Sequence, residues 1–135
     1  GLWEITAWYI ANGYDQLKYY GSSLTDSGKR TESTKYVTVY PHDKTETSTN
    51  LDTKSRANYE VNKYIFGDAI RETSTSGSGL TSWKGDYFCF PALRNPFSLR
   101  GGGLLNGSGA GLFYFYCSDG SSYYYGGFRP VLVAL

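Results

Sequence analysis

Short aromatic segments separated by glycine-rich turns fill the last 51 residues of this 135-residue chain, from Gly85 to Leu135. The run of glycines at residues 101–103 and the aromatic stretch at residues 112–116 are examples of the two kinds of segment. Glycine interrupts helices and favours tight turns, whereas aromatic residues favour strands. The pattern therefore predicts short strands joined by ordered loops, with few helices.

The residues before Gly85 predict one helix and a few further strands. Apolar residues recur at helical spacing over residues 55–66, and Gly67 stands where a helix end is expected. The alternation of residues 36–40 predicts a strand. We interpret residues 68–73 and 128–133 as further strands and residues 74–79 as a loop. Four apolar side chains near the N-terminus are expected in the core: Trp3, Ile5, Trp8 and Ile10.

The length, charge and first residue limit the class of protein. A chain of 135 residues suits a single domain, so we expect one domain over residues 1–135. Thirteen basic and twelve acidic residues leave a net charge of +1, which gives no electrostatic footprint for nucleic acid. No apolar run is long enough to cross a bilayer. Because the chain begins with Gly1 and contains no Met, we expect it to be the C-terminal part of a longer protein.

The residue types that carry catalysis or bind metals do not form a known motif. His42 is the single histidine, and beside Asp43 in a polar loop it is expected to be exposed. Cys89 and Cys117 are expected to be two thiols, although a disulfide between them stays open. Loop carbonyls and scattered carboxylates leave a structural calcium ion open as well. We therefore expect no catalytic residues, no cofactor and no enzymatic activity.

The last 51 residues contain no Lys, Glu, Gln, Trp or Met, although the preceding 84 contain 16 such residues. At the same frequency, about ten would be expected. A buried core would exclude Lys and Glu but accept Met and Trp, and a flexible linker would lack this density of Tyr and Phe. The five missing amino acids share the property that no codon ending in a pyrimidine encodes them. This composition is expected of a gene segment whose codons mostly end in a pyrimidine and vary at their first two bases.

The residues that remain in this region suit a recognition surface. Tyr gives a large contact area while losing few rotamers, and Ser, Gly and Asn adapt their hydrogen bonds. A core would not readily satisfy the hydroxyls of so many tyrosines. We therefore expect Phe113 and Phe115 to point inward from one strand, and Tyr114 and Tyr116 to point outward. Five tyrosines fall within twelve positions, namely Tyr114, Tyr116, Tyr123, Tyr124 and Tyr125.

The C-terminal region contains three motifs, namely Asn95-Pro96-Phe97 with Arg100-Gly101-Gly102, then Ala110-Gly111-Leu112-Phe113, and Gly127-Phe128-Arg129-Pro130-Val131-Leu132. They resemble those of the formylglycine-generating-enzyme type of the C-type lectin fold. The chain is most similar to the variable proteins of diversity-generating retroelements, in which error-prone reverse transcription alters codons at adenines. The resemblance covers most of the chain and implies an α+β fold with few helices, short strands and much ordered loop.

The resemblance divides the C-terminal region into fixed and diversified positions, with a variable region at about residues 88–127. Arg100 and Arg129 are expected to make structural hydrogen bonds, while Leu104 and Leu105 are left open between core and surface. The fixed positions are Asn95, Pro96, Phe97, Arg100, Gly101, Gly102, Ala110, Gly111, Phe113, Phe115, Gly127, Phe128 and Arg129. The diversified positions, which the resemblance implies contact the ligand, are Leu93, Arg94, Ser98, Leu99, Gly103, Leu104, Leu105, Asn106, Tyr114, Tyr116, Cys117, Ser118, Asp119, Ser122, Tyr123, Tyr124 and Tyr125.

The function that the resemblance implies is ligand binding or adhesion through an exposed, diversified face rich in Tyr, Ser and Gly. The domain would be extracellular, on a phage virion or a bacterial cell surface, as part of a larger fibre, pilus or surface protein. Its ligand would be a protein or a glycan on a cell surface. Two alternatives stay open: a structural virion or surface protein without a binding role, and an enzyme of the sulfatase-modifying type. Enzymes of that fold use a reactive cysteine pair or a metal bound by histidine, and neither is matched here.

Overall fold

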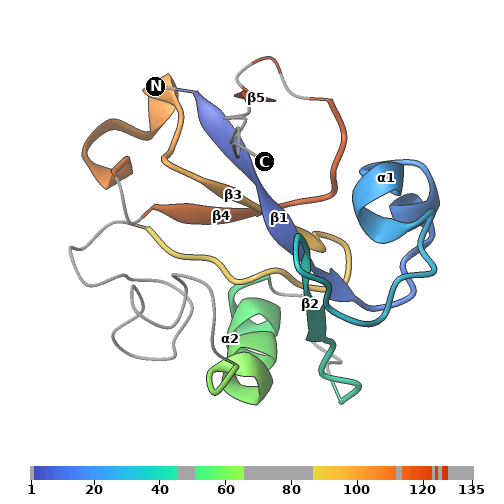
Figure 1. Cartoon of the computed structure of the whole chain (residues 1–135). Helices are drawn as coiled ribbons and strands as arrows, with labels where there is room; N and C mark the ends of the chain where they lie inside the picture. Colours follow the sequence, from blue (N-terminus) through green and yellow to red (C-terminus); the bar gives the residue numbers. More distant parts are fainter. Residues whose placement is uncertain are drawn as a thin grey trace.

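The computed structural model describes residues 2–45, 51–65, 87–111, 114–122, 124 and 126–127. Within these residues the fold is mixed α+β, with one five-stranded sheet, two α-helices and two 3-10 helices (Figure 1). The expected class, with few helices and short strands, is confirmed at this level. The strands expected at residues 68–73 and 128–133, the loop at residues 74–79 and the helix end at Gly67 lie outside the described residues.

The sheet is built around its first strand, β1 (Trp3–Ala11). On one side β1 pairs with β2 (Thr38–Pro41) and β5 (Gly126–Gly127), both parallel to it. It also pairs with β3 (Phe97–Arg100), which in turn pairs with β4 (Phe115–Ser118), and both of these ladders are antiparallel. The N-terminal strand is therefore inserted among strands from the C-terminal third of the chain (Figure 1).

An irregularity in the pairing of β1 and β3 shapes the sheet. Ile5 pairs with Leu99, whereas Tyr9 pairs with Phe97, so β1 accommodates extra residues between the two pairs. Such a bulge bends its strand and increases the local twist. The hydroxyl of Thr6, within this stretch, donates to the Ser98 carbonyl over 3.0 Å.

The helices cover opposite faces of the sheet. Successive side chains of a strand point to opposite faces, and Trp8 and Ile10 pack with Tyr59 of α2 (Leu51–Asn62). Tyr9 lies between them in sequence and packs instead against Leu17. Leu17 belongs to η1 (Asp15–Lys18), which precedes α1 (Ser22–Thr25), while η2 (Leu104–Gly109) follows β3.

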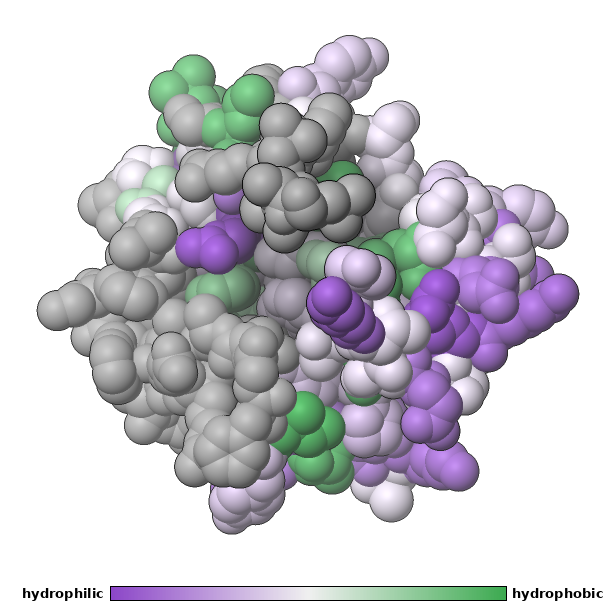
Figure 2. Space-filling model, in the orientation of Figure 1, coloured by the Kyte–Doolittle hydropathy of each residue, from purple (hydrophilic) through white to green (hydrophobic). Residues whose placement is uncertain are grey.

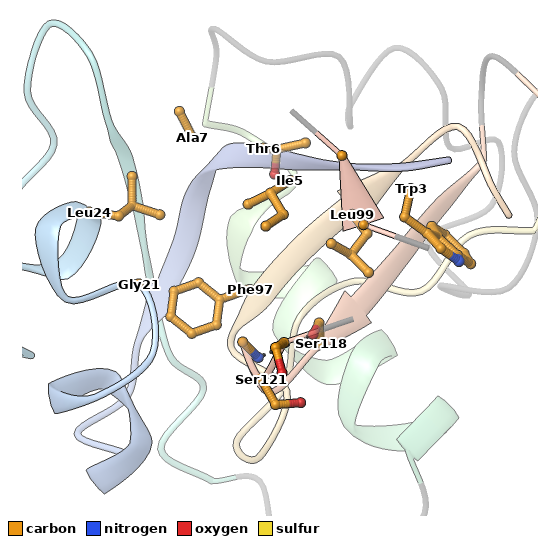
Figure 3. A pocket seen from close by; sticks show the side chains of 14 residues that line it. Trp3, Ile5, Thr6, Ala7, Gly21, Leu24, Phe97, Leu99, Ser118 and Ser121 are labelled. Carbon is orange, nitrogen blue, oxygen red and sulfur yellow. Dashed lines mark hydrogen bonds between the residues drawn. The ribbon is translucent and has the colours of Figure 1, made fainter. Parts of the chain in front are cut away.

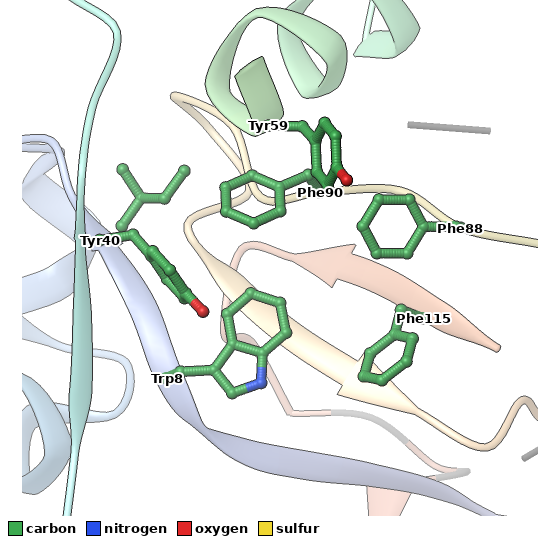
Figure 4. Close-up of a cluster of buried hydrophobic side chains, with 7 residues drawn as sticks. Trp8, Tyr40, Tyr59, Phe88, Phe90 and Phe115 are labelled. Carbon is green, nitrogen blue, oxygen red and sulfur yellow. The ribbon is translucent and has the colours of Figure 1, made fainter. Parts of the chain in front are cut away.

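Aromatic rings form the larger core, between the sheet and α2. The Trp8 ring lies 5.5 Å from Tyr40 and 5.8 Å from Phe90, and Phe88 lies 6.0 Å from Phe115 (Figure 4). Edge-to-face and tilted contacts of this kind add to the free energy gained from burial. The core positions expected for Trp3, Trp8 and Ile10 are confirmed.

The expectation that Ile5 lies in the core is wrong. Its side chain is 59% exposed, although it sits near the middle of the sheet. Ile5 points to the face that carries Leu99, and that face is hollow at this point. Burial by the described residues is therefore incomplete here.

The helix expected at residues 55–66 is found four residues earlier, as α2, and its buried face differs from the one predicted. Val61 and Tyr64 are 50% and 70% exposed, whereas Asn58 and Asn62 are buried. The Asn62 amide donates to the Pro41 carbonyl over 2.8 Å, and the Asn58 side-chain oxygen accepts from the Asp43 backbone N–H over 2.8 Å. The orientation of α2 is therefore fixed by asparagine side chains that form hydrogen bonds with backbone groups at the end of β2. It is not fixed by an apolar stripe along the helix.

The strand expected at residues 36–40 is β2, shifted by two residues at its start. Tyr36 is 76% exposed, and its backbone N–H is bound by the Thr34 hydroxyl, as is the N–H of Val37. This side-chain turn satisfies the backbone locally, so that the ladder with β1 begins only at Thr38.

Candidate functional site

A hollow of about 270 Å³ lies beside the first residues of β1. Trp3 supplies one wall, η2 and the residue before it supply another, and the segment leading into β4 supplies the third. Six of its seven lining residues belong to the set expected to be diversified, and Trp3 is the seventh. The six are Gly103, Leu104, Leu105, Asn106, Tyr114 and Tyr116.

Asn106 holds this wall together. Its side-chain oxygen accepts from the Gly103 N–H over 2.7 Å, and its amide donates to the Tyr114 hydroxyl over 3.1 Å. The turn carries Leu104 and Leu105 outward, where they are 75% and 82% exposed. The open question about the two leucines is thus settled in favour of the surface, and an apolar patch is visible over the η2 segment at the upper left of Figure 2.

An aromatic cluster forms the floor of the hollow. The Trp3 ring lies 4.9 Å from Tyr114 and 5.6 Å from Tyr116, and Tyr87 lies 5.9 Å from Tyr116. Tyr114 is only 5% exposed, so the expectation that it points outward is wrong. It packs with Trp3 and Leu99, whereas Tyr116 is half-buried. The inward position expected for Phe115 is confirmed, and Phe113 lies outside the described residues.

The buried Tyr114 hydroxyl makes stability depend on alkaline pH. Burial raises the pKa of Tyr114 to about 12, Tyr116 adds to the rise, and the hydrogen bond from Asn106 opposes it. In the unfolded chain a tyrosine titrates near pH 10. The folded protein therefore holds this proton more tightly, and the resulting stability is complete below about pH 10 and is lost as the pH rises toward 12. We expect the Tm to fall over this range, and to fall less in Tyr114→Phe. If Tm falls equally with pH in the parent and in Tyr114→Phe, then Tyr114 is not the group responsible.

A second, larger hollow of about 510 Å³ opens on the same face of the sheet and also reaches Trp3 (Figure 3). Leu24 and Phe97 lie at one end of it, and Ser118 and Ser121 lie along one side (Figure 3). Three of its lining residues belong to the diversified set. They are Leu99, Ser118 and Ser122.

Leu93 and Arg94 are not brought to either hollow. The Leu93 carbonyl accepts from the side-chain amide of Asn12 over 2.7 Å, and Asn12 directly follows the end of β1. Trp3 lies at the start of the same nine-residue strand, roughly 30 Å away at about 3.3 Å per residue. Arg94 is exposed in the turn that joins Ala92 to Asn95. These two positions therefore belong to a different part of the surface.

Several positions expected to be diversified and exposed are buried, and for these the expected exposure is wrong. Ser98 and Cys117 are paired across β3 and β4, and their side chains share the face that carries Phe115, against which the segment 87–90 packs. Gly103 has no room for a side chain, because a Cβ atom there would lie 2.7 Å from the Trp3 Nε1. In the β3–β4 ladder, neighbouring strands on both sides of β3 leave little exposed surface. The buried positions are Ser98, Leu99, Gly103, Tyr114, Cys117 and Ser118.

Ser98 carries a cost that a substitution will reveal. Its side chain is fully buried, and none of the described residues forms a hydrogen bond with its Oγ. A buried hydroxyl without a partner costs about 1–3 kcal/mol. We therefore expect Ser98→Ala to raise the free energy of unfolding by about 1 kcal/mol in urea denaturation. Ser121→Ala is the control, because its hydroxyl donates to Asp119 over 2.7 Å and its loss should destabilise the protein. A destabilised Ser98→Ala variant would contradict this prediction.

The loop after β4 carries the remaining expected positions. Asp119 is half-buried, and its carboxylate accepts from the Ser121 N–H and hydroxyl over 2.9 and 2.7 Å. Ser122 is exposed, and Tyr124 is fully exposed at 101%. Tyr123 and Tyr125 lie outside the described residues.

The single histidine is half-buried, not fully exposed as expected, in a third hollow near Asn12. One oxygen of the neighbouring Asp43 carboxylate accepts from the Thr45 hydroxyl and N–H over 2.7 and 2.9 Å. The hydrogen bond from the Thr45 hydroxyl is the main reason that the pKa of Asp43 is lowered. Within the part of the chain that the structure describes, no three His, Cys, Asp or Glu side chains are grouped as metal ligands.

Two contributors to the site are not predicted by the sequence. The local pattern places Trp3 in the core but not in the site, and it gives Tyr87 no role in binding. Both residues pack against Tyr116. The pairing of β1 with β3 and β5 places Trp3, and the pairing of the segment at Phe88 with Phe115 places Tyr87. No local sequence pattern reveals either pairing.

Comparison of the chain with protein-family models, with curated proteins and with solved structures gives no match. Among the described residues, no helix has both the length and the apolar character that crossing a bilayer requires.

Proposed function

We propose that this chain is a retroelement-diversified ligand-binding or adhesion domain with a C-type lectin-like fold, and that it binds without catalysis. The observation that supports this most is the composition of the hollow beside Trp3. Six of its seven lining residues belong to the set that sequence resemblance alone marks as diversified, and four of the six are not buried: Leu104, Leu105, Asn106 and Tyr116. These residues come from two segments, 103–106 and 114–116, which the fold brings to one place.

The arrangement suits recognition because it separates support from contact. Trp3, Gly103 and Tyr114 are buried and hold the backbone in place, while Leu104 and Leu105 are exposed and Tyr116 is half-buried. A preformed backbone reduces the entropy lost on binding. Large side chains at the centre of an interface contribute on the order of 2 kcal/mol each. Changing the exposed residues would therefore change the ligand while the frame stays the same.

The setting we propose for this domain is extracellular, on a phage virion or a bacterial surface, within a larger fibre, pilus or surface protein. The ligand would be a protein or a glycan on a cell surface. A net charge of +1 offers little attraction for nucleic acid or for an anionic membrane. We propose neither as a partner.

The DNA around the gene tests this proposal. A diversified gene should have, nearby, a template repeat with Asn-type codons at the diversified positions and a reverse transcriptase gene. The exposed positions Leu104, Leu105, Ser122 and Tyr124 are the most informative ones. Ordinary codons at all of them, with no template repeat and no reverse transcriptase gene, would overturn the diversification claim.

A further inference from the structure

The larger hollow has uncharged walls. It is formed by β1, β3, α1 and the loop after β4, and among the described residues that line it none is charged. Its volume, about 510 Å³, lies in the range of about 300–1,000 Å³ that is usual for ligand pockets. The side chains that face it are mainly apolar, with Phe97 and Leu99 from β3 opposite Ile5 from β1 (Figure 3).

Glycine backbones hold the floor of this hollow in place. A Cβ atom at Gly120 would lie 2.5 Å from the Phe97 ring, and one at Gly21 would lie 2.9 Å from the same ring. The backbone therefore packs directly on both sides of Phe97, whose exposure is only 3%. The hollow is preformed, and Ile5 at its rim is left 59% exposed.

Three of the four hydroxyl groups that line the hollow make hydrogen bonds within the protein, and the fourth, that of Ser122, is exposed. Thr6 donates to the Ser98 carbonyl over 3.0 Å, and Ser121 donates to Asp119 over 2.7 Å. The Ser118 Oγ accepts from the Gly120 N–H over 3.1 Å. A sugar ring needs several polar partners and an accessible aromatic face. The two aromatic rings here, Trp3 and Phe97, are 6% and 3% exposed. The wall is therefore poorly suited to a glycan.

We propose that this hollow takes an uncharged apolar side chain, of the size of leucine or phenylalanine, from a protein ligand. The inference rests on the proposed binding function and narrows the ligand class from protein or glycan to protein. The hollow beside Trp3 would contact the same ligand through diversified residues. The larger hollow, which is built mostly from residues outside the diversified set, would supply a constant apolar anchor.

An NMR titration of the ¹⁵N-labelled chain tests the anchor. The probes are N-acetyl-phenylalaninamide and N-acetyl-leucinamide, with methyl α-glucopyranoside for comparison. We expect the two amides to shift the backbone signals of Thr6, Ala7, Gly21 and Gly120, and the glucoside to leave them unchanged. Shifts with the glucoside alone, or shifts with no probe, would overturn the proposal.

A matched pair of variants locates the binding. Ile5→Asp places a charge in the wall and should weaken binding of the amides at least tenfold. Leu2→Asp is the control, because Leu2 is also 59% exposed but does not line the hollow. If Ile5→Asp does not fold, Ile5→Ser replaces it in the binding test. Equal binding by Ile5→Asp and Leu2→Asp would also contradict the proposal. If the gene carries the template codons but the amides do not bind, the proposal of an apolar protein side chain as ligand is rejected. The proposed function as a diversified binding domain is then unaffected.

A second inference rests on the two cysteines. Cys89 lies beside β4, where its N–H donates to the Phe115 carbonyl over 3.0 Å, and Cys117 lies within β4. Their side chains are 0% and 1% exposed, and the two Sγ atoms are 2.8 Å apart. This separation is shorter than the best non-bonded distance even for carbon atoms, about 3.5 Å.

We infer that Cys89 and Cys117 are a cross-linking site that ties a diversified strand to the segment beside it. In the reaction an external small-molecule disulfide is reduced to two thiols. The two protein thiols lose two electrons and two protons, and one S–S bond forms. Since both sulfurs are buried, the exchange takes place while the chain folds.

Refolding with oxidised glutathione, compared with refolding in a reducing agent, tests this site. We expect the oxidised sample to show no reactive thiols after denaturation, a mass about two daltons lower, and a Tm higher by roughly 5 °C or more. The Cys117→Ser variant should show neither the loss of mass nor the rise in Tm. Two reactive thiols in the denatured oxidised sample would overturn the inference.

Discussion

Replacing Phe115 by Ala is expected to lower the free energy of unfolding by about 3–5 kcal/mol. Phe115 is 2% exposed, and its ring lies 6.0 Å from Phe88 and 6.3 Å from Trp8. The Arg100 guanidinium lies 6.0 Å from the same ring and would lose this contact as well. Domains of this size are stable by only about 5–15 kcal/mol, so the loss is a large share of the total. Urea denaturation measures it.

Tyr124→Ala is the matched control for this change. Tyr124 is also an aromatic residue of the C-terminal region, but it is fully exposed. We expect its replacement to change the free energy of unfolding by less than about 0.5 kcal/mol. Similar losses for the two variants would contradict the division between a fixed frame and exposed contact residues.

Replacing Gly120 by Ala is expected to destabilise the fold by about 3 kcal/mol or more. The Gly120 backbone has a φ of +90°, where a side chain is strained at a cost of about 1–3 kcal/mol. The new Cβ would also lie 2.5 Å from the Phe97 ring and 2.7 Å from the Cβ of Tyr20, and overpacking of this kind costs about 1–3 kcal/mol. Phe97 is held in the core and has little freedom to move aside.

Gly13→Ala separates the two causes. Gly13 also has a positive φ, +72°, but a Cβ atom added there would meet nothing within 4 Å. Its replacement should therefore cost only the backbone strain, about 1 kcal/mol. Thermal unfolding of both variants checks the difference. An equal fall in Tm would mean that the contact with Phe97 does not limit this position.

The sequence predicted the fold class and most of the N-terminal core, because those features depend on local patterns. Trp3, Trp8 and Ile10 are buried as expected. The orientation of α2 was not predictable in this way, because Asn58 and Asn62 face inward to bind backbone groups. Such a role depends on the position of β2, which the periodicity of the helix does not contain.

The candidate site was predicted only in part, because burial at its positions depends on strand pairing between distant residues. The resemblance marks the positions that are expected to vary, but it does not distinguish exposed residues from buried ones. Leu104 and Leu105 are exposed because η2 lies outside the sheet. Ser98 and Cys117 are buried, and they lie on the face of β3 and β4 against which the segment 87–90 packs. Strand pairing between residues about 90 positions apart, such as Ile5 with Leu99, decides these outcomes.

We propose that exposed residues of the C-terminal region are interchangeable on a fixed frame. A display library randomised at Leu104, Leu105, Ser122 and Tyr124 tests it, with sorting first for protease resistance and then for binding to hen lysozyme as an arbitrary protein ligand. We expect most members to resist protease as the parent does, and we expect selection to yield binders that differ at these four positions. Widespread loss of resistance, or resistant members from which no binder is selected, would contradict it.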